Sequence, residues 1–152
     1  MALITVQGRV RIVTRDRQRR VLSDSGWSAN TVVNGYLAAL AAWSAGVPNS
    51  TLGTPVATQT ILGTGTGTPA VTDTSLFTPD VSTLLDCASL TTPASPANTA
   101  QWVSVYTQPA GTFTEVGLIT TDGVLYAHKL ATVTISSGTQ TTVTWQISFS
   151  AG

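Results

Sequence analysis

The sequence contains few charged residues. Asp, Glu, Lys and Arg make up 9% of its 152 residues, against roughly 25% in an average soluble domain. Its 28 threonines supply polarity instead, and as β-branched residues they favour strands. Because a surface so poor in charge creates little repulsion between molecules, we expect partner proteins to cover much of it.

Cysteine and histidine are also scarce, with Cys87 and His128 as the single examples. One cysteine cannot form an intramolecular disulfide, and we interpret Cys87 as a small buried residue. A zinc site needs three or four suitable ligands close together, and the seven acidic residues are too scattered for a calcium site. The sequence therefore predicts no metal and no cofactor.

Signatures of catalysis are missing as well. The sequence has no G-x-S-x-G nucleophile motif. Glu115 and Asp122 flank a predicted hairpin, where we interpret them as a hydrogen-bonded contact and a turn residue. We place His128 on a strand face. No catalytic residue and no enzymatic activity are expected.

Long apolar runs do not occur. The longest, GYLAALAAW at 35–43, is much shorter than the ~20 residues that cross a bilayer as a helix. The first residues, MALITVQGRVRIV, lack the apolar core of a signal peptide. We expect synthesis in the cytoplasm and no membrane partner.

The charges that are present are unevenly distributed. Six arginines and Asp16 lie between Arg9 and Arg20, a net charge of +5, and the rest of the chain carries −5. This asymmetry predicts a basic end that meets an acidic surface on a neighbour, which could be another copy of the chain. The alternative is a solvated hairpin tip. Nucleic acid is not an expected partner, because no aromatic residue lies between the arginines.

Apart from one helix, the pattern is typical of strands. Residues 3–22 are predicted to form a basic N-terminal hairpin, and residues 55–150 are rich in strands, with tight turns at Asp122-Gly123 and Ser137-Gly138. In the last strand the apolar residues alternate with polar ones, so one face is buried: Val143, Trp145, Ile147 and Phe149. The chain, 1–152, is expected to be a single domain that is mainly β, an antiparallel β-sandwich (jelly-roll-like) with one α-helix near the N-terminus.

The helix is predicted over residues 28–45 from its apolar spacing. Ser28 or Asn30 could cap it, and Gly46 and Pro48 end it. The predicted buried stripe consists of Val33, Tyr36, Leu37 and Leu40, with Trp43 or Ser44. The opposite face is small and almost uncharged, so we expect a loop or another subunit to cover it: Asn30, Asn34, Ala38, Ala41 and Ala42.

A glycine-rich segment, ILGTGTGTPAVTDTSLF at 61–77, follows a predicted strand at 55–62. It leads into a predicted helical turn at Thr68-Pro69, after which Leu76 and Phe77 turn inward. A phosphate-binding loop of this kind needs a following lysine or the spacing G-x-G-x-x-G. Here no lysine follows, and the spacing is G-x-G-x-G. We interpret the glycines as a corner in a β protein.

Several short motifs follow one another in a definite order. They are N-x-x-x-N-x-x-L-x-x-L at 30–40, then G-T-G-T and T-P-x-x-x-D-T-x-L within 61–76, then T-E-V-G-L, D-G, L-Y-A and a Thr/Val/Trp strand within 114–149. In this order the chain resembles a family of small structural proteins and domains of tailed bacteriophages, described as tail-fibre, collar or capsid-associated proteins. The likeness covers more than half of the chain. The family's E-I-G-L-F reads E-V-G-L-I here, at 115–119.

The resemblance implies a non-enzymatic structural protein of the virion. Its expected partners are other phage structural proteins, such as the major capsid, collar or tail proteins, and a homo-oligomer is expected. A capsid decoration or cement protein and a collar or baseplate adaptor both stay open. The expected protein interface consists of Arg15, Arg17, Arg19, Arg20, Asn34 and Ala38. The alternative is a tail-fibre or host-recognition module that binds carbohydrate on a platform of Trp102, Tyr106, Tyr126 and Trp145.

Overall fold

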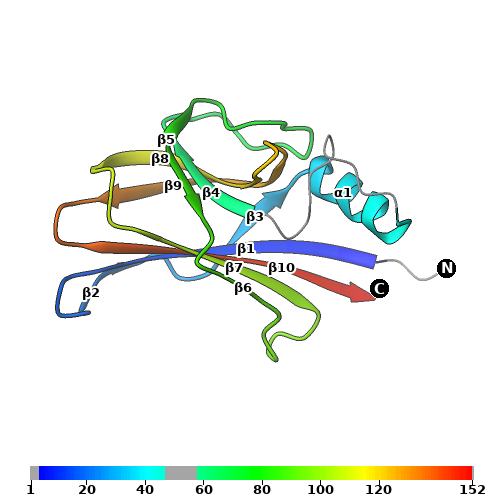
Figure 1. Cartoon of the computed structure of the whole chain (residues 1–152), viewed down its shortest axis with the longest axis horizontal. Coiled ribbons are helices and arrows are strands. Elements are labelled where there is room, and N and C mark those ends of the chain that lie inside the picture. The colour runs from blue at the N-terminus through cyan, green and yellow to red at the C-terminus, as the bar shows by residue number, and fades with distance from the viewer. Residues whose placement is uncertain (1–3, 47–57, 152) are drawn as a thin grey trace.

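The computed structural model describes residues 4–46 and 58–151, and it is mainly β with one helix (Figure 1). This confirms the mainly β class with one helix. All pairings between its strands are antiparallel. The elements in chain order are β1 (Ile4–Arg15), β2 (Val21–Asp24), β3 (Ser28–Val32), α1 (Asn34–Ser44), β4 (Thr58–Gly63), β5 (Pro79–Asp86), β6 (Ser89–Thr91), β7 (Thr99–Tyr106), β8 (Gly111–Thr120), β9 (Leu125–Ile135) and β10 (Gln140–Ala151).

The strands form one sheet that curls back on itself. Its order is β5-β4-β8-β9-β3-β1-β10-β7-β6, with β2 beside β1. The first and last strands of this order, β5 and β6, are consecutive in the chain. Between them the Cys87 amide donates to Thr58 on β4, at 3.2 Å, and the Ala88 amide donates to Val103 on β7, at 2.7 Å. The two ends of the sheet therefore meet, and its two halves face each other (Figure 1).

Strand β3 makes the second crossing between the halves. Residues 28–30 pair with β1, whereas Thr31 and Val32 pair with β9. The prediction of a helix from residue 28 was wrong in this part, because pairing with two strands outweighs a short local pattern. Ser28 and Asn30 do not cap α1. Val33 holds the cap position without a side-chain hydrogen bond.

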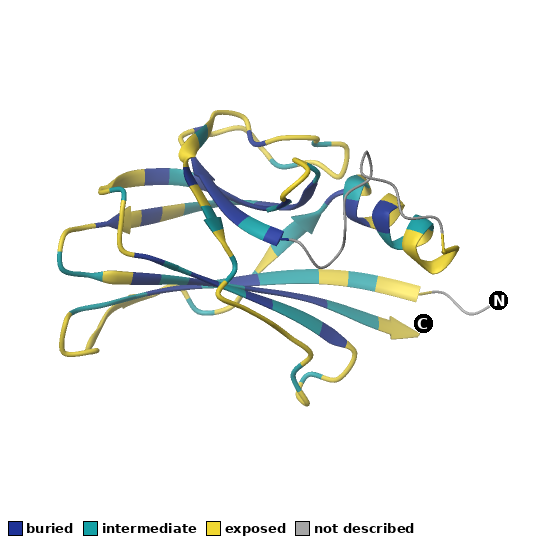
Figure 2. Cartoon of the chain, viewed as in Figure 1, coloured by how far each residue is buried: buried dark blue, intermediate teal, exposed yellow. Residues whose placement is uncertain are grey.

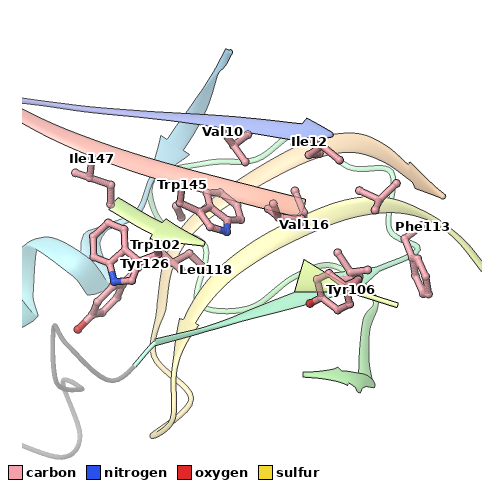
Figure 3. Close-up of a cluster of buried hydrophobic side chains, with 14 of the residues drawn as sticks. Val10, Ile12, Trp102, Tyr106, Phe113, Val116, Leu118, Tyr126, Trp145 and Ile147 are labelled. Carbon is pink, nitrogen blue, oxygen red and sulfur yellow. The ribbon is translucent and has the colours of Figure 1, made fainter. Parts of the chain in front are cut away.

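The core lies between the two halves of the sheet (Figures 2 and 3). Val143, Trp145 and Ile147 of β10 are fully buried in it, as their alternation predicted. The hydroxyl of Tyr106 donates to the backbone carbonyls of Thr60 and Thr83, at 2.9 and 2.8 Å. Buried polar groups thus bind across the core and hold β4 and β5 against β7.

Helix α1 packs through a narrower stripe than its sequence predicts. Tyr36 and Ala39 are buried, but Leu37 and Trp43 are 42% and 52% exposed. A side chain at Gly35 would place its Cβ 2.7 Å from the Leu125 carbonyl oxygen. At Gly35 the backbone of α1 therefore approaches β9 too closely for a side chain, and the helix buries Tyr36 and Ala39 instead of Leu37.

Three shorter predictions have mixed outcomes. The hairpin of 3–22 forms and continues to Asp24, whereas residue 3, Pro48 and the first part of the strand at 55–62 lie outside the described residues. The helical turn at Thr68-Pro69 is instead one hydrogen-bonded turn, from the Asp73 amide to the Ala70 carbonyl. Leu76 is buried, but Phe77 is 43% exposed.

Among the described residues no helix is both long and apolar enough to cross a bilayer.

Candidate functional site

The glycine-rich loop after β4 binds a carboxylate of its own chain. The Gly65 and Thr78 amides donate to Oε1 of Glu115, at 2.9 and 2.7 Å, and the Phe77 amide donates to Oε2, at 3.0 Å. A loop with converging amides suits an anion, and here Glu115 on β8 is that anion. The corner interpretation holds, since the loop folds over β8.

The glycines allow this close approach. A Cβ on Gly65 would lie 2.5 Å from the Cβ of Phe77 and 2.6 Å from Oε1 of Glu115. A Cβ on Gly63 would also lie 2.6 Å from Oε1. All three separations are shorter than van der Waals contact, so Gly63 and Gly65 reflect close packing around Glu115.

His128 on β9 joins Glu115 to a second carboxylate. Its Nε2 lies 2.9 Å from Oε2 of Glu115, and its Nδ1 lies 2.9 Å from Oδ2 of Asp73. Asp73 in turn accepts from the Ala70 amide. Each ring nitrogen of His128 therefore lies within hydrogen-bonding distance of one carboxylate oxygen. We call Gly65, Asp73, Glu115 and His128 the Glu115 network.

The network holds Glu115 in its ionised form. Burial alone would raise the pKa of Glu115, but donation from the Thr78 and Phe77 amides, His128 and the Gly65 amide outweighs burial and lowers that pKa below 4.5. Burial also acts to raise the pKa of Asp73, and donation from the Ala70 amide and from His128 lowers it below 3.8. Both acids therefore favour the charged state.

This network is closed to a substrate. His128 and Glu115 are 0% exposed, and the ring of Phe77 lies over His128 with 4.8 Å between the ring centroids. Glu115 accepts four hydrogen bonds, which saturate its oxygens. In the described part of the chain no group of three or more acidic, histidine or cysteine side chains could hold a metal ion. What the arrangement does is fasten the loop after β4 to β8 and β9.

Sequence reasoning missed the network. It placed Glu115 in a hairpin contact and His128 on a strand face, although Glu115 binds a loop 50 residues away. The available signal was the order of motifs: G-T-G-T supplies Gly65, D-T-x-L supplies Asp73 and E-V-G-L supplies Glu115. No spacing rule for a known site connects them.

The four arginines of the expected interface lie on the hairpin of β1 and β2. Arg17, Arg19 and Arg20 are exposed and Arg15 is partly exposed. Arg20 forms an ion pair with Asp16, at 2.7 Å. Among the described residues Arg17 and Arg19 have no ion-pair partner. Both line a hollow of about 340 Å³ beside Gly138 and Thr139 in the turn between β9 and β10.

The other two expected interface residues lie on α1. Asn34 and Ala38 are exposed, together with Leu37 and Trp43, and α1 contains no charged residue. The structure does not bring them together with the arginines, because α1 and the β1–β2 turn lie at opposite ends of the molecule (Figure 1).

The proposed carbohydrate platform is not on the surface. Trp102, Tyr106, Tyr126 and Trp145 are at most 3% exposed, so their rings cannot stack on a sugar. They alternate along strands and face the core, which is the commoner role of such rings. Cys87 is partly buried, and burial raises the pKa of its thiol.

A groove of about 960 Å³ opens where β3 leaves β1 for β9. Arg9 stacks on Trp27 there, 4.4 Å from the ring centroid. Both polar atoms of the Asn30 side chain are buried and have no partner among the described residues. This groove offers the amide and the partly exposed tryptophan that a small polar ligand would need.

Comparisons with known protein families, curated proteins and solved structures find no match to this chain.

Proposed function

We propose that this chain is a non-enzymatic structural protein of a tailed-bacteriophage virion. In this role it binds other virion proteins, as a capsid decoration or cement protein or as a collar or baseplate adaptor. It is made in the cytoplasm of the host bacterium and ends up in the virion.

The distribution of reactive side chains carries the proposal. His128 and Glu115 are buried and saturated, and the exposed face of α1 is uncharged. The exposed positive charge gathers on the hairpin, where Arg17 and Arg19 are available to a partner. Such a surface suits protein contact better than chemistry.

The motifs behind the resemblance support the proposal from a second side. Two of them, within 61–76, supply Gly65 and Asp73, and a third supplies Glu115, 50 residues after Gly65, to one network. Each motif is weakly specific by itself, but residues from all three meet in the same hydrogen-bonded network. The likeness to phage structural domains accordingly rests on residues that hold the fold together.

A finer description of the fold belongs to the same proposal. We describe the curled sheet as a jelly-roll-like sandwich, in which β3 and the β5–β6 segment cross between two layers. Such small β domains suit repeated subunits of a lattice, where many weak contacts add up.

The test is the copy number of the chain in purified virions, measured by quantitative mass spectrometry against the major capsid protein. Hundreds of copies would indicate a decoration protein. About six to a few dozen copies would indicate a collar, baseplate or fibre part, as expected for closed symmetric assemblies. Absence from virions would contradict the proposal.

The alternative function is a tail-fibre or host-recognition module that binds carbohydrate. The groove with Trp27 and Asn30 favours it. In that case Trp27→Ala and Asn30→Ala would each abolish glycan binding in a titration, whereas Trp43→Ala, at an exposed tryptophan on α1, would leave it unchanged.

A further inference from the structure

We propose that the hairpin of one copy of this chain binds the outer face of β5 on a second copy, so that copies join head to tail. The basic hairpin surface consists of Arg15, Arg17, Arg19, Val21 and Leu22. The acidic strand surface consists of Asp80, Ser82, Leu84 and Asp86. The proposal rests on the structural role proposed above and names one partner for it, the chain itself.

The basic hairpin surface combines charge with exposed apolar area. Val21 and Leu22 of β2 are 53% and 58% exposed, and β2 pairs with no described strand except β1. Arg17 and Arg19 line the hollow next to the turn between β9 and β10. The hollow is also lined by Asp16, whose charge is paired with Arg20. A carboxylate entering it would meet the guanidinium groups of Arg17 and Arg19, which bind carboxylates with paired hydrogen bonds.

The backbone at Arg19 adds to this argument. Its φ is 62°, in the left-handed region that favours glycine or asparagine. An arginine in this position of the turn is costly for the backbone. The turn keeps this conformation through Asp16, which accepts from the Gln18 and Arg20 amides, and it presents the Arg19 side chain to solvent.

The acidic strand surface is complementary in charge and in apolar content. Ser82, Leu84 and Asp86 are exposed and alternate along β5, while Thr83 between them points to the core. Asp80 lies beyond a register shift in the pairing of β4 with β5 and is partly exposed. Neither Asp80 nor Asp86 pairs with a cationic side chain in the described part of the chain. Leu84 between them is 41% exposed. The apolar residues of the two surfaces can pack while their charges pair.

The two surfaces are different parts of one chain, since β2 lies beside β1 and β5 beside β4. When two copies bind through one such contact, one copy still has a free basic hairpin surface and the other a free acidic strand surface. Such a heterologous contact repeats and gives a ring or a filament. The competing explanation is that the arginines only keep the exposed strand β2 from aggregating.

A charge-swap experiment separates these explanations. One variant carries Arg17→Glu and Arg19→Glu, and the other carries Asp80→Lys and Asp86→Lys. Sedimentation velocity at low salt should show assemblies for the wild type that dissociate as salt rises. Each variant alone should be monomeric, with a dissociation constant at least about a hundredfold higher, because like charges would meet. An equimolar mixture of the two variants should assemble again, since each then offers the charge that the other lacks.

The matched control is Asp122→Lys, which reverses an exposed acid in the turn between β8 and β9 and should leave assembly unchanged. Circular dichroism checks that each variant folds. Because Asp80 accepts from the Ser82 amide and hydroxyl, Asp86→Lys alone replaces the double variant if that one does not fold.

Three results would overturn the inference: a wild-type chain that stays monomeric at about 0.5 mM, a mixture that fails to assemble, or a control that disrupts assembly as strongly as the variants. The virion copy number is independent of all three. A high copy number in virions would support the structural role even if the contact between the hairpin and β5 were disproved.

Discussion

The Glu115 network and the basic hairpin surface use charge in opposite ways. In the network, Glu115 and His128 are buried, Asp73 is partly buried, and both carboxylate oxygens of Glu115 have hydrogen-bond partners. On the hairpin, Arg17 and Arg19 are exposed and have no acidic partner in the described part of the chain. Although the chain has few charges, it uses those of the Glu115 network to stabilise the fold and leaves those of the hairpin exposed at the surface. Substitutions in the first should change stability, and substitutions in the second should change association.

The largest effect is expected from Glu115→Ala. It leaves three backbone amides and His128 without their acceptor inside the protein, and breaking a buried charge network costs about 3–5 kcal/mol. Urea unfolding followed by tryptophan fluorescence measures the loss. Asp122→Ala, at an exposed turn, should stay within about 0.5 kcal/mol. A loss below about 1 kcal/mol for Glu115→Ala would show that the network does not hold the fold.

A smaller loss is expected from Gly65→Ala. The added Cβ would lie 2.6 Å from Oε1 of Glu115, so loop and carboxylate must move apart, at about 1–3 kcal/mol. The same urea unfolding experiment measures it. Thr66→Ala, at the exposed neighbouring position, is the matched control and should change little. Equal losses for both variants would mean that the loop tolerates no change at all, for reasons unrelated to Glu115.

Acid should weaken the network in a defined pH range. The pKa of Glu115 is lowered on folding, so its contribution is complete above about pH 4.5, the usual pKa of a glutamate. It is lost as pH falls through the lowered pKa, because the proton then binds the unfolded chain first. Wild-type thermal midpoints should fall below pH 4.5 more steeply than those of Glu115→Gln. Parallel curves would assign the acid sensitivity to other carboxylates.

The smallest effect on stability is expected from the pair Arg17→Glu and Arg19→Glu. Both side chains are exposed and neither has an ion-pair partner among the described residues, so the free energy of unfolding should change by no more than about 0.5 kcal/mol. Urea unfolding provides the value. A loss as large as that of Gly65→Ala would remove the distinction between the two regions.

The sequence predicted correctly those features that depend on neighbouring residues, namely the buried face of a strand, exposed charges and a tight turn. The alternation in β10 gave its buried face, and the charge of Arg17 and Arg19 kept them outside because unpaired charges are costly to bury. The turn at Asp122-Gly123 also forms, with Gly123 at φ 88°.

What the sequence did not predict depends on contacts between distant segments. Strand β3 exists because β1 and β9 each pair with part of it. The buried stripe of α1 is set by the close approach of Gly35 to Leu125. The Glu115 network joins three segments through contacts that span up to 55 residues. Periodicity within a window cannot reveal such contacts.

The most direct test of the central claim is the incorporation of the charge-reversed hairpin into virions. Phage carrying Arg17→Glu, Arg19→Glu and Arg20→Glu would be purified, and the chain would be quantified in particles and in the cell lysate. We predict normal folded protein in the lysate and its loss from particles, with Asp122→Lys incorporated as the wild type is. Incorporation of the hairpin variant at the wild-type level would contradict the account, because the exposed arginines would then have no part in joining the chain to the virion.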